Sequence, residues 1–145
     1  MNLFLKDYIS IKIHQTDLIL TSCVKARLEP YNLAPEQNLI MMLLWEKDGL
    51  TQNQIAETLG KDKTNIARMA ANLESKGFIR RTGCPNDRRS LKLYLSPEGK
   101  ALSEQVVPTL EGFNDLICKG ITKEEIVFLE TILSKFNQNV QKCNE

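Results

Sequence analysis

The sequence predicts a mainly α-helical chain with one small β-hairpin. Apolar residues recur at helical spacing towards both ends of the 145 residues. Two short helical patterns separated by a glycine lie in the middle, and a pair of short alternating segments follows them. Hydrophobic residues make up 42% and charged residues 26% of the chain. These proportions are ordinary for a folded domain, and they exclude a disordered or low-complexity chain.

The first 29 residues are predicted to form one long helix, because neither Gly nor Pro occurs before Pro30. A terminal helix of this length has more apolar surface than a small domain covers. Pro35 suits the first turn of a second helix, which is expected to end near Lys47, before Asp48 and Gly49. This second helix is apolar nearly all round, so we expect it to be central. The apolar positions of the first helix are Leu5, Ile9, Ile13, Leu20, Val24 and Leu28.

The next two helices have clear start and stop signals. Thr51 and Gln54 have the spacing of a capping box, and Gly60 is expected to end the short helix that follows. Asp62 is a good N-cap for another helix, which Gly77 is expected to end. Two helices joined by a tight turn that contains glycine are typical of a helix-turn-helix. The expected inner face of its second helix consists of Ile66, Met69 and Leu73.

Residues 78–82 and 91–95 are predicted to pair as a β-hairpin. The second segment alternates strictly, which places its three leucines on one face. The loop between them, residues 83–90, is basic and rich in turn-forming residues. The hairpin therefore has a protruding, positively charged tip.

The C-terminal part is predicted to be helical again. Ser96 and Pro97 suit the N-cap and first position of a helix, and Pro108 predicts a kink or break inside it. Thr122 and Glu125 have the spacing of a second capping box. The apolar residues after that box recur at spacings of three and four, which suits the seam of a helical dimer. They are Ile126, Leu129, Leu133, Phe136 and Val140.

The charge is unevenly distributed along the chain. The formal net charge is only +1, which by itself argues against a polyanionic partner. Residues 50–96, however, contain nine basic and four acidic residues and carry +5, while the remainder contains ten basic and fourteen acidic residues and carries −4. A basic module between acidic helical arms fits a polyanion that is contacted through one face.

The helix-turn-helix predicts contact with double-stranded DNA, because the second helix of this motif enters the major groove. The residues expected in the major groove are Lys63, Thr64, Asn65 and Arg68. Residues at the start of the preceding helix, Thr51, Gln52 and Gln54, are expected to position the phosphate backbone. The alternative is that all of these are ordinary polar surface positions.

The hairpin tip predicts a second DNA contact. Arg89 is expected to enter the minor groove, where the potential is most negative. Asp87 is expected to hold that guanidinium in place, and Arg88 to contact phosphate. The alternative is a solvated cluster of charges on a turn.

These residues resemble a known family. From Asp87 to Gly99 the sequence is similar to the wing signature of the MarR family of winged helix-turn-helix transcription regulators, which reads Asp-x-Arg, five residues, Leu-Thr, two residues, Gly. The one departure within it is Ser96, which stands in place of Thr. Residues 50–56 and 73–81 also fit the family's pattern, and the resemblance covers essentially the whole chain.

The resemblance implies a sequence-specific regulator, a repressor in the first instance, that binds a palindromic operator as a homodimer. It implies an N-terminal dimerisation helix (1–34), a winged helix-turn-helix DNA-binding domain (35–96), and a C-terminal linker with dimerisation helices (97–145). Two departures are Ala34, where the family often has a capping Thr or Ser, and Pro108, which bears on half-site spacing. The alternative is a winged-helix architectural or protein-interaction module without specific DNA readout.

An enzyme is not expected, because the chain has one histidine and neither a phosphate-binding glycine loop nor an HExxH motif. The resemblance implies regulation by a small aromatic ligand or by an oxidant. The candidate redox residue is Cys84, because it lies on the basic wing; the alternative is that the thiols are inert. The candidate ligand-lining residues, each of which has plain core or surface as its alternative, are His14, Tyr31, Trp45 and Cys118.

The sequence also predicts where the chain resides. The longest apolar run, residues 39–45, is far shorter than the roughly 20 residues of a membrane span, and the charged N-terminus does not suit a signal peptide. We therefore expect a cytoplasmic protein with no membrane contact. The four cysteines are scattered without a CxxC pair, so neither a metal nor a cofactor is expected.

Overall fold

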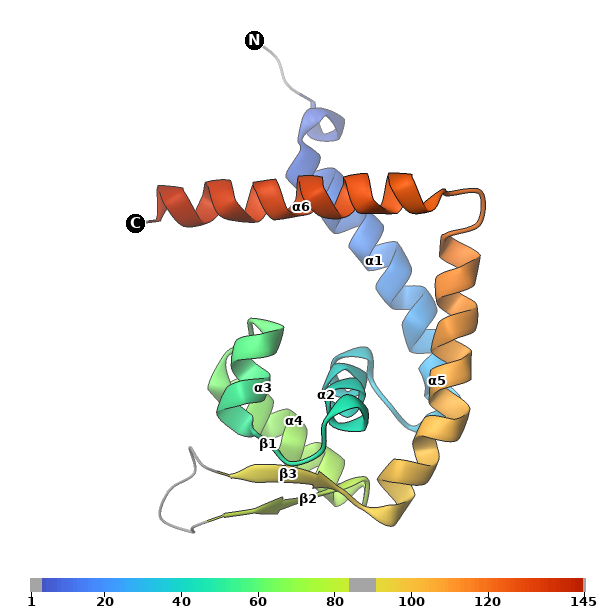
Figure 1. Cartoon of the computed structure of the whole chain (residues 1–145), viewed down its shortest axis with the longest axis vertical. Helices are drawn as coiled ribbons and strands as arrows, with labels where there is room; N and C mark the ends of the chain where they lie inside the picture. Colours follow the sequence, from blue (N-terminus) through green and yellow to red (C-terminus); the bar gives the residue numbers. More distant parts are fainter. Residues whose placement is uncertain (1–3, 84–90, 145) are drawn as a thin grey trace. The chain divides into compact units, whose positions relative to one another are not determined.

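The computed structural model describes residues 4–83 and 91–144 (Figure 1). The chain divides into two compact units, Met1–Leu110 and Glu111–Glu145. The elements, in chain order, are η1 (Leu5–Asp7), α1 (Ile9–Leu28), η2 (Glu29–Tyr31), α2 (Pro35–Glu46), β1 (Leu50–Thr51), α3 (Gln52–Leu59), α4 (Lys63–Ser75), β2 (Ile79–Thr82), β3 (Lys92–Leu95), α5 (Pro97–Ile117) and α6 (Lys123–Cys143).

The N-terminal helix is shorter than the sequence predicts. A separate 3-10 turn, η1, precedes it, and α1 begins only at Ile9. The carboxylate of Asp7 accepts a hydrogen bond from the backbone N–H of Phe4 at 3.1 Å, which closes that turn. Tyr8 then adopts an extended conformation, with φ −90° and ψ 116°, and this interrupts the helical backbone. Leu28 is the one residue of α1 that is fully buried.

The helix-turn-helix is confirmed, with the expected caps. Thr51 Oγ1 accepts from the backbone N–H of Gln54 at 3.1 Å, and Gln54 Oε1 accepts from the backbone N–H of Thr51 at 2.9 Å. Gly60 ends α3 in the left-handed conformation, with φ +64°. Asp62 Oδ1 accepts from the backbone N–H of Thr64 at 3.1 Å and so begins α4. These local interactions fix where α3 begins and ends and where α4 begins.

The hydrophobic core lies between the helices α2, α3 and α4 and a small sheet. The predicted inner face of α4, Ile66, Met69 and Leu73, is buried as expected. The central position predicted for α2 is also confirmed, because three of its apolar side chains are almost fully buried. The largest fully buried side chains are Leu28, Ile40, Met41, Leu44, Ile55, Ile66, Leu73, Ile79, Leu93 and Val106.

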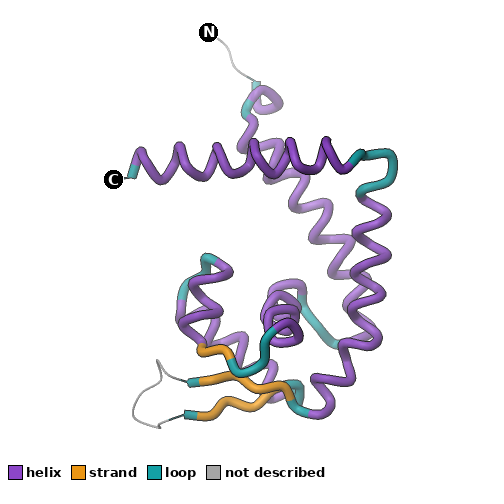
Figure 2. The backbone as a smooth tube through the Cα atoms, in the orientation of Figure 1, coloured by secondary structure: helices purple, strands orange, loops and turns teal. Residues whose placement is uncertain are grey.

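The sheet has three antiparallel strands in the order β1-β3-β2, which Figure 2 shows in orange. The hairpin of β2 and β3 is confirmed, with Ile79 opposite Leu95. The short strand β1, which the sequence analysis does not anticipate, pairs Leu50 with Leu93. Because side chains alternate along a strand, one face of the hairpin is buried while Arg80 and Lys92 are exposed on the other.

The helix α5 runs without interruption from Pro97 to Ile117, so the predicted break at Pro108 is absent, while the predicted kink stays a prediction. Proline removes one backbone donor, but the turns around it remain anchored. Val106 is fully buried, and Thr109 Oγ1 donates to the backbone carbonyl of Gln105 at 2.9 Å. The helix continues through Pro108 although a proline removes one hydrogen bond of the ladder and crowds the preceding turn.

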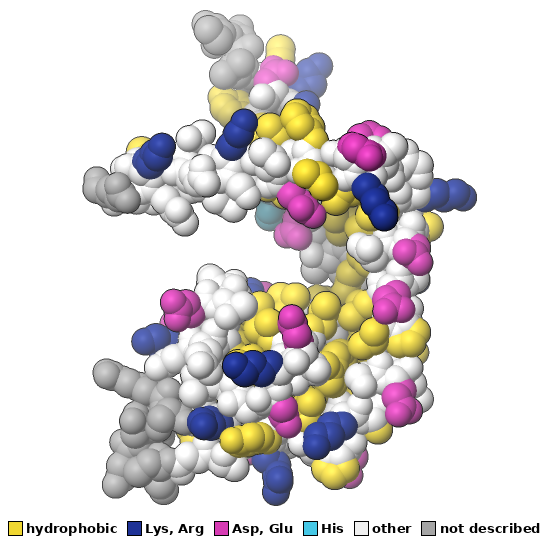
Figure 3. All heavy atoms as spheres, viewed as in Figure 1, with side chains coloured by type: hydrophobic (Ala, Val, Ile, Leu, Met, Phe, Trp, Pro, Cys, Tyr) yellow, Lys and Arg dark blue, Asp and Glu magenta, His cyan; other side chains and the backbone are white. Residues whose placement is uncertain are grey.

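In the second unit, the predicted capping box at the start of α6 is confirmed. Thr122 Oγ1 accepts from the backbone N–H of Glu125, and Glu125 Oε1 accepts from the backbone N–H of Thr122, both at 3.1 Å. Much of the apolar stripe of α6 is open to solvent in the single chain: Leu129 is 51% exposed and Val140 60%. Apolar side chains are visible along α6 in Figure 3. Within residues 4–83 and 91–144, every helix is too short or too polar to cross a membrane.

Candidate nucleic-acid interface

The outer face of α4 is polar and accessible. Lys63, Thr64 and Arg68 are exposed and Asn65 is half-buried, while the opposite face of the helix forms part of the core. The first turn does not leave all of its amides free, because Asp62 occupies the backbone N–H of Thr64. The side chains of this face, more than the helix terminus, are therefore available to a partner.

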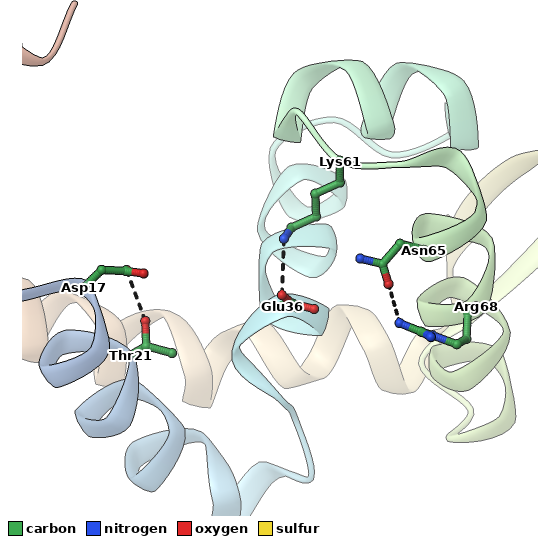
Figure 4. A network of polar contacts seen from close by, with 6 residues as sticks. All are labelled: Asp17, Thr21, Glu36, Lys61, Asn65 and Arg68. Atoms are coloured by element: carbon green, nitrogen blue, oxygen red, sulfur yellow. Dashed lines mark hydrogen bonds and ion pairs between the residues drawn. The ribbon is translucent and has the colours of Figure 1, made fainter. Parts of the chain in front are cut away.

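Two of the predicted major-groove residues contact each other. Arg68 Nη2 donates a hydrogen bond to Asn65 Oδ1 at 2.5 Å, on the exposed side of α4 (Figure 4). On the sequence alone, they are predicted as separate polar positions. Their spacing of three residues, which places side chains side by side on a helix, is the signal that could have revealed the contact.

The three predicted phosphate-contacting residues of the α3 region have different surroundings. Thr51 and Gln54 are engaged in the capping box, and the Gln54 side chain is exposed. Gln52 is only 7% exposed, so its side chain does not extend from the surface to a phosphate in this conformation. Its Oε1 is buried without a hydrogen-bond partner among the described residues.

The outer face of the hairpin carries basic side chains. Arg80 and Lys92 are exposed there, together with Thr82, and neither cation has a hydrogen-bond partner within the described part of the chain. The predicted wing residues Asp87, Arg88 and Arg89 lie outside the described residues, as does Cys84. The strands that lead towards this loop are therefore the described part of the predicted wing.

An ion pair that the sequence analysis does not identify joins the end of α4 to β2. The backbone N–H of Arg81 donates to Glu74 Oε2 at 2.8 Å, and its Nε and Nη2 donate to Oε1 at 3.2 and 3.1 Å. The backbone hydrogen bond, followed by the guanidinium, lowers the pKa of the Glu74 carboxyl below its usual value. The pair fixes the beginning of the hairpin against the end of α4.

The basic residues of the module divide into two groups. Three of them hold the fold together: Arg81 through Glu74, Lys61 through Glu36 at 3.3 Å (Figure 4), and Lys76 through the backbone oxygen of Asn32 and the side-chain oxygen of Gln37 in α2. The remaining described basic residues of the module face solvent and have no described acidic partner. They are Lys63, Arg68, Arg80 and Lys92.

The predicted ligand-lining residues do not converge within the first unit. His14 is exposed on α1, about 20 Å along the helix axis from Leu28. Tyr31 Oη lies 3.4 Å from Thr109 Oγ1, whereas Trp45 Nε1 donates to the backbone carbonyl of Gly99 at 2.9 Å. These two partners are about 15 Å apart along α5. Each aromatic residue therefore has a separate structural contact.

Cys118 is half-buried and belongs to the second unit. Within the part of the chain that the structure describes, there is no group of three or more His, Cys, Asp or Glu residues that could hold a metal ion.

Comparison with known proteins agrees with this geometry. Residues 33–91 match the sequence model described as the MarR family. A MarR-family transcriptional regulator from Listeria monocytogenes, solved in complex with a 26-mer DNA, is 26% identical over 97% of this chain and 90% of its own, with a TM-score of 0.77. The transcriptional regulator SlyA is 26% identical over 92% of this chain and 94% of its own, with a TM-score of 0.80.

A mutant of MarR from E. coli, solved with operator DNA, has a TM-score of 0.81 and is 24% identical, over 94% of this chain and 99% of its own. The match to the family model spans the helix-turn-helix and the strand β2, and the likeness to solved structures extends over both units. Residues 33–91 therefore match the MarR family, and the chain as a whole is similar in fold to solved MarR-family transcriptional regulators.

Proposed function

We propose that this protein is a sequence-specific DNA-binding repressor that binds a palindromic operator as a homodimer. The observation that carries the proposal is the outer face of α4, where Lys63, Thr64 and Arg68 are exposed on a helix whose other face is held in the core. Such a helix, the second of a helix-turn-helix, fits the major groove. The Listeria structure, which contains DNA, supports the same use of this fold.

The hairpin supplies the second contact in this proposal. The exposed side chains of Arg80 and Lys92 suit phosphate contacts, because neither is neutralised by a described acidic partner. Arg89 takes the minor groove, Asp87 positions it, and Arg88 contacts phosphate. These three roles rest on the sequence and on its resemblance to the family's wing signature.

The dimer in this proposal uses residues 1–34 and 97–145, while residues 35–96 bind DNA. The exposed apolar side chains of α1 and α6 support this division, since Ile9 is 55% and Phe128 67% exposed in the single chain. A two-fold symmetric pair of lobes requires a palindromic site. A small aromatic effector or an oxidant would act on this dimer.

Selection of bound fragments from random DNA tests the central claim. We expect a palindromic consensus in which each half-site is contacted by one α4 helix. Binding without any consensus would refute specific readout and would favour an architectural winged-helix module.

Substitution of Arg89 by Ala tests the wing. We expect weaker operator binding and an unchanged thermal midpoint of unfolding. The slope of log affinity against log salt concentration should fall by about one unit, because one cation contact is lost. Lys47→Ala is the matched control, because it removes an exposed positive charge outside the basic segment. Operator affinity that is equal in the Arg89 variant and the wild type would exclude the minor-groove role.

A further inference from the structure

The contact between Asn65 and Arg68 bears on how α4 would read a base. We propose that Asn65 is a positioning residue for Arg68, and that the two side chains read a single guanine as one unit. This inference rests on the proposed function, because it needs a protein that selects a DNA sequence. It deepens that function by assigning different roles to two residues that otherwise look like two independent base readers.

The first argument comes from the donors of Arg68. A guanidinium has five N–H donors, and a fork of two of them matches O6 and N7 of guanine. Among the described residues, Arg68 forms one hydrogen bond, from Nη2 to Asn65 Oδ1 at 2.5 Å. The second N–H of Nη2 and both N–H groups of Nη1 are left to contact a base. The bond to Asn65 therefore restrains the side chain without using up the fork.

The second argument comes from the acceptor of Asn65. To read adenine, an asparagine accepts from N6 through its oxygen and donates to N7 through its nitrogen. In this structure Oδ1 of Asn65 is turned towards Arg68 (Figure 4). Reading adenine would require Oδ1 to accept from N6 through its second lone pair beside the bound guanidinium, or to release Arg68. Asn65 is also half-buried, whereas Arg68 is exposed, so Arg68 is the better placed of the two to reach a base.

The third argument is entropic. An exposed arginine side chain loses rotamer freedom when it is fixed against a base, and this loss weakens binding. A neighbour that already restrains the guanidinium in the free protein reduces the loss. Asn65 would thus strengthen the guanine contact without touching the base.

The experiment compares base preferences after selection from random DNA for the wild type, Arg68→Ala, Asn65→Ala, Asn65→Asp and the double Ala variant. We expect Arg68→Ala to lower the preference for guanine at one base pair of each half-site by roughly 5- to 150-fold. We expect Asn65→Ala to lower the preference at that same base pair. The double Ala variant should lose no more of the preference for guanine than Arg68→Ala alone, because the two residues act on one contact.

Asn65→Asp separates the two roles. Aspartate keeps an acceptor oxygen for Arg68, so the guanine preference should persist while overall affinity falls with the added negative charge. An adenine reader would lose its preference, because aspartate lacks the amide donor to N7. Asn72→Ala is the matched control: it makes the same change two turns later on α4, at an exposed side chain, and should leave the guanine preference in place.

The outcomes are distinguishable. If the wild type selects a consensus and Asn65→Ala alters a different base pair from Arg68→Ala, or alters none, this inference is overturned and the proposed function stands. Loss of the preference in Asn65→Asp, with adenine as the base affected, overturns it as well. A wild type that selects no consensus at all overturns the proposed function and this inference with it.

Discussion

Replacement of Gly99 by Ala should destabilise the protein strongly, although Gly99 lies inside a helix, where Ala is ordinarily preferred. A Cβ at this position would lie 2.0 Å from the backbone oxygen of Phe78 and 3.0 Å from its carbonyl carbon. The obstacle is backbone, so no side chain can rotate out of the way.

The surrounding hydrogen bonds prevent the helix from retreating. Ser96 donates from its backbone N–H to the carbonyl of Phe78 at 3.0 Å, and its Oγ accepts from the backbone N–H of Gly99 at 3.0 Å. Trp45 Nε1 holds the carbonyl of Gly99 from the side of α2. Any shift that makes room for the methyl group therefore strains one or more of these bonds.

The magnitude follows from three contributions. Overpacking costs about 1–3 kcal/mol, each lost hydrogen bond about 1 kcal/mol, and the better helix propensity of Ala returns about 1 kcal/mol. The net expectation is a loss of about 3 kcal/mol, which for a chain of this size lowers the thermal midpoint by about 6–12 °C.

Gly112→Ala is the matched control. It lies in the same helix, and a Cβ there meets nothing within 4 Å. It should raise the free energy of unfolding by about 0.5–1 kcal/mol, because alanine lowers the backbone entropy of the unfolded chain and meets no obstacle in the folded one. Urea unfolding followed by far-UV circular dichroism measures both variants. The reasoning is refuted if Gly99→Ala is as stable as the wild type, or if the two substitutions shift stability in the same direction.

Three further predictions concern stability. Glu74→Gln should cost less than about 1 kcal/mol at neutral pH, because the ion pair is partly exposed. Because the pKa of Glu74 is lowered in the folded state, the ion pair stabilises the fold fully above the ordinary pKa of 4.5, and this stabilisation disappears as the pH falls through the folded pKa. The difference in unfolding free energy between the wild type and Glu74→Gln should therefore close in acid. Urea titrations in which this difference is the same at every pH would contradict the prediction. Thr122→Ala should cost about 1 kcal/mol through the lost cap, whereas Thr131→Ala, at an exposed hydroxyl bonded back to its own helix, should be neutral or better in the same assay. Lys76→Met should cost about 1 kcal/mol, measured by thermal unfolding, because the backbone oxygen of Asn32 loses its side-chain donor while Gln37 Oε1 keeps the backbone N–H of Ala34.

The features that the sequence predicts well are local ones. The capping boxes join residues three apart, so the side chain and its backbone partner are visible in one short stretch, as with Thr51 and Gln54. The inner face of α4 follows from helical spacing alone. The buried and exposed faces of the hairpin follow in the same way from alternation.

The features that the sequence analysis misses depend on segments far apart in the chain. Strand β1 consists of two residues, and its partner Leu93 lies more than forty positions from Leu50. Trp45 is a candidate for a ligand pocket on sequence grounds, but its indole contacts Gly99 across a separation of 54 residues. The burial of Gln52 likewise depends on what packs over it, and a polar residue at a helix start gives no hint of that.

The same limit applies to the candidate interface. The sequence places Asn65 and Arg68 on one face of a helix, but the conformations of their side chains decide whether they act separately or as a pair. The pairing of Glu74 with Arg81 depends on the turn between α4 and β2. That turn sets which of the two adjacent arginines of β2 faces the helix and which faces solvent.

The position of Lys76 has a mechanical consequence. This residue caps the end of α4, and its ammonium bonds to the backbone oxygen of Asn32 at 2.8 Å and to Gln37 Oε1 at 2.7 Å. Asn32 marks the left-handed turn, with φ +57°, by which the chain leaves α1 and enters α2. The connector and α4 therefore share one anchor. The Lys76 side chain therefore ties the residues that lead from α1 into α2 directly to the end of α4.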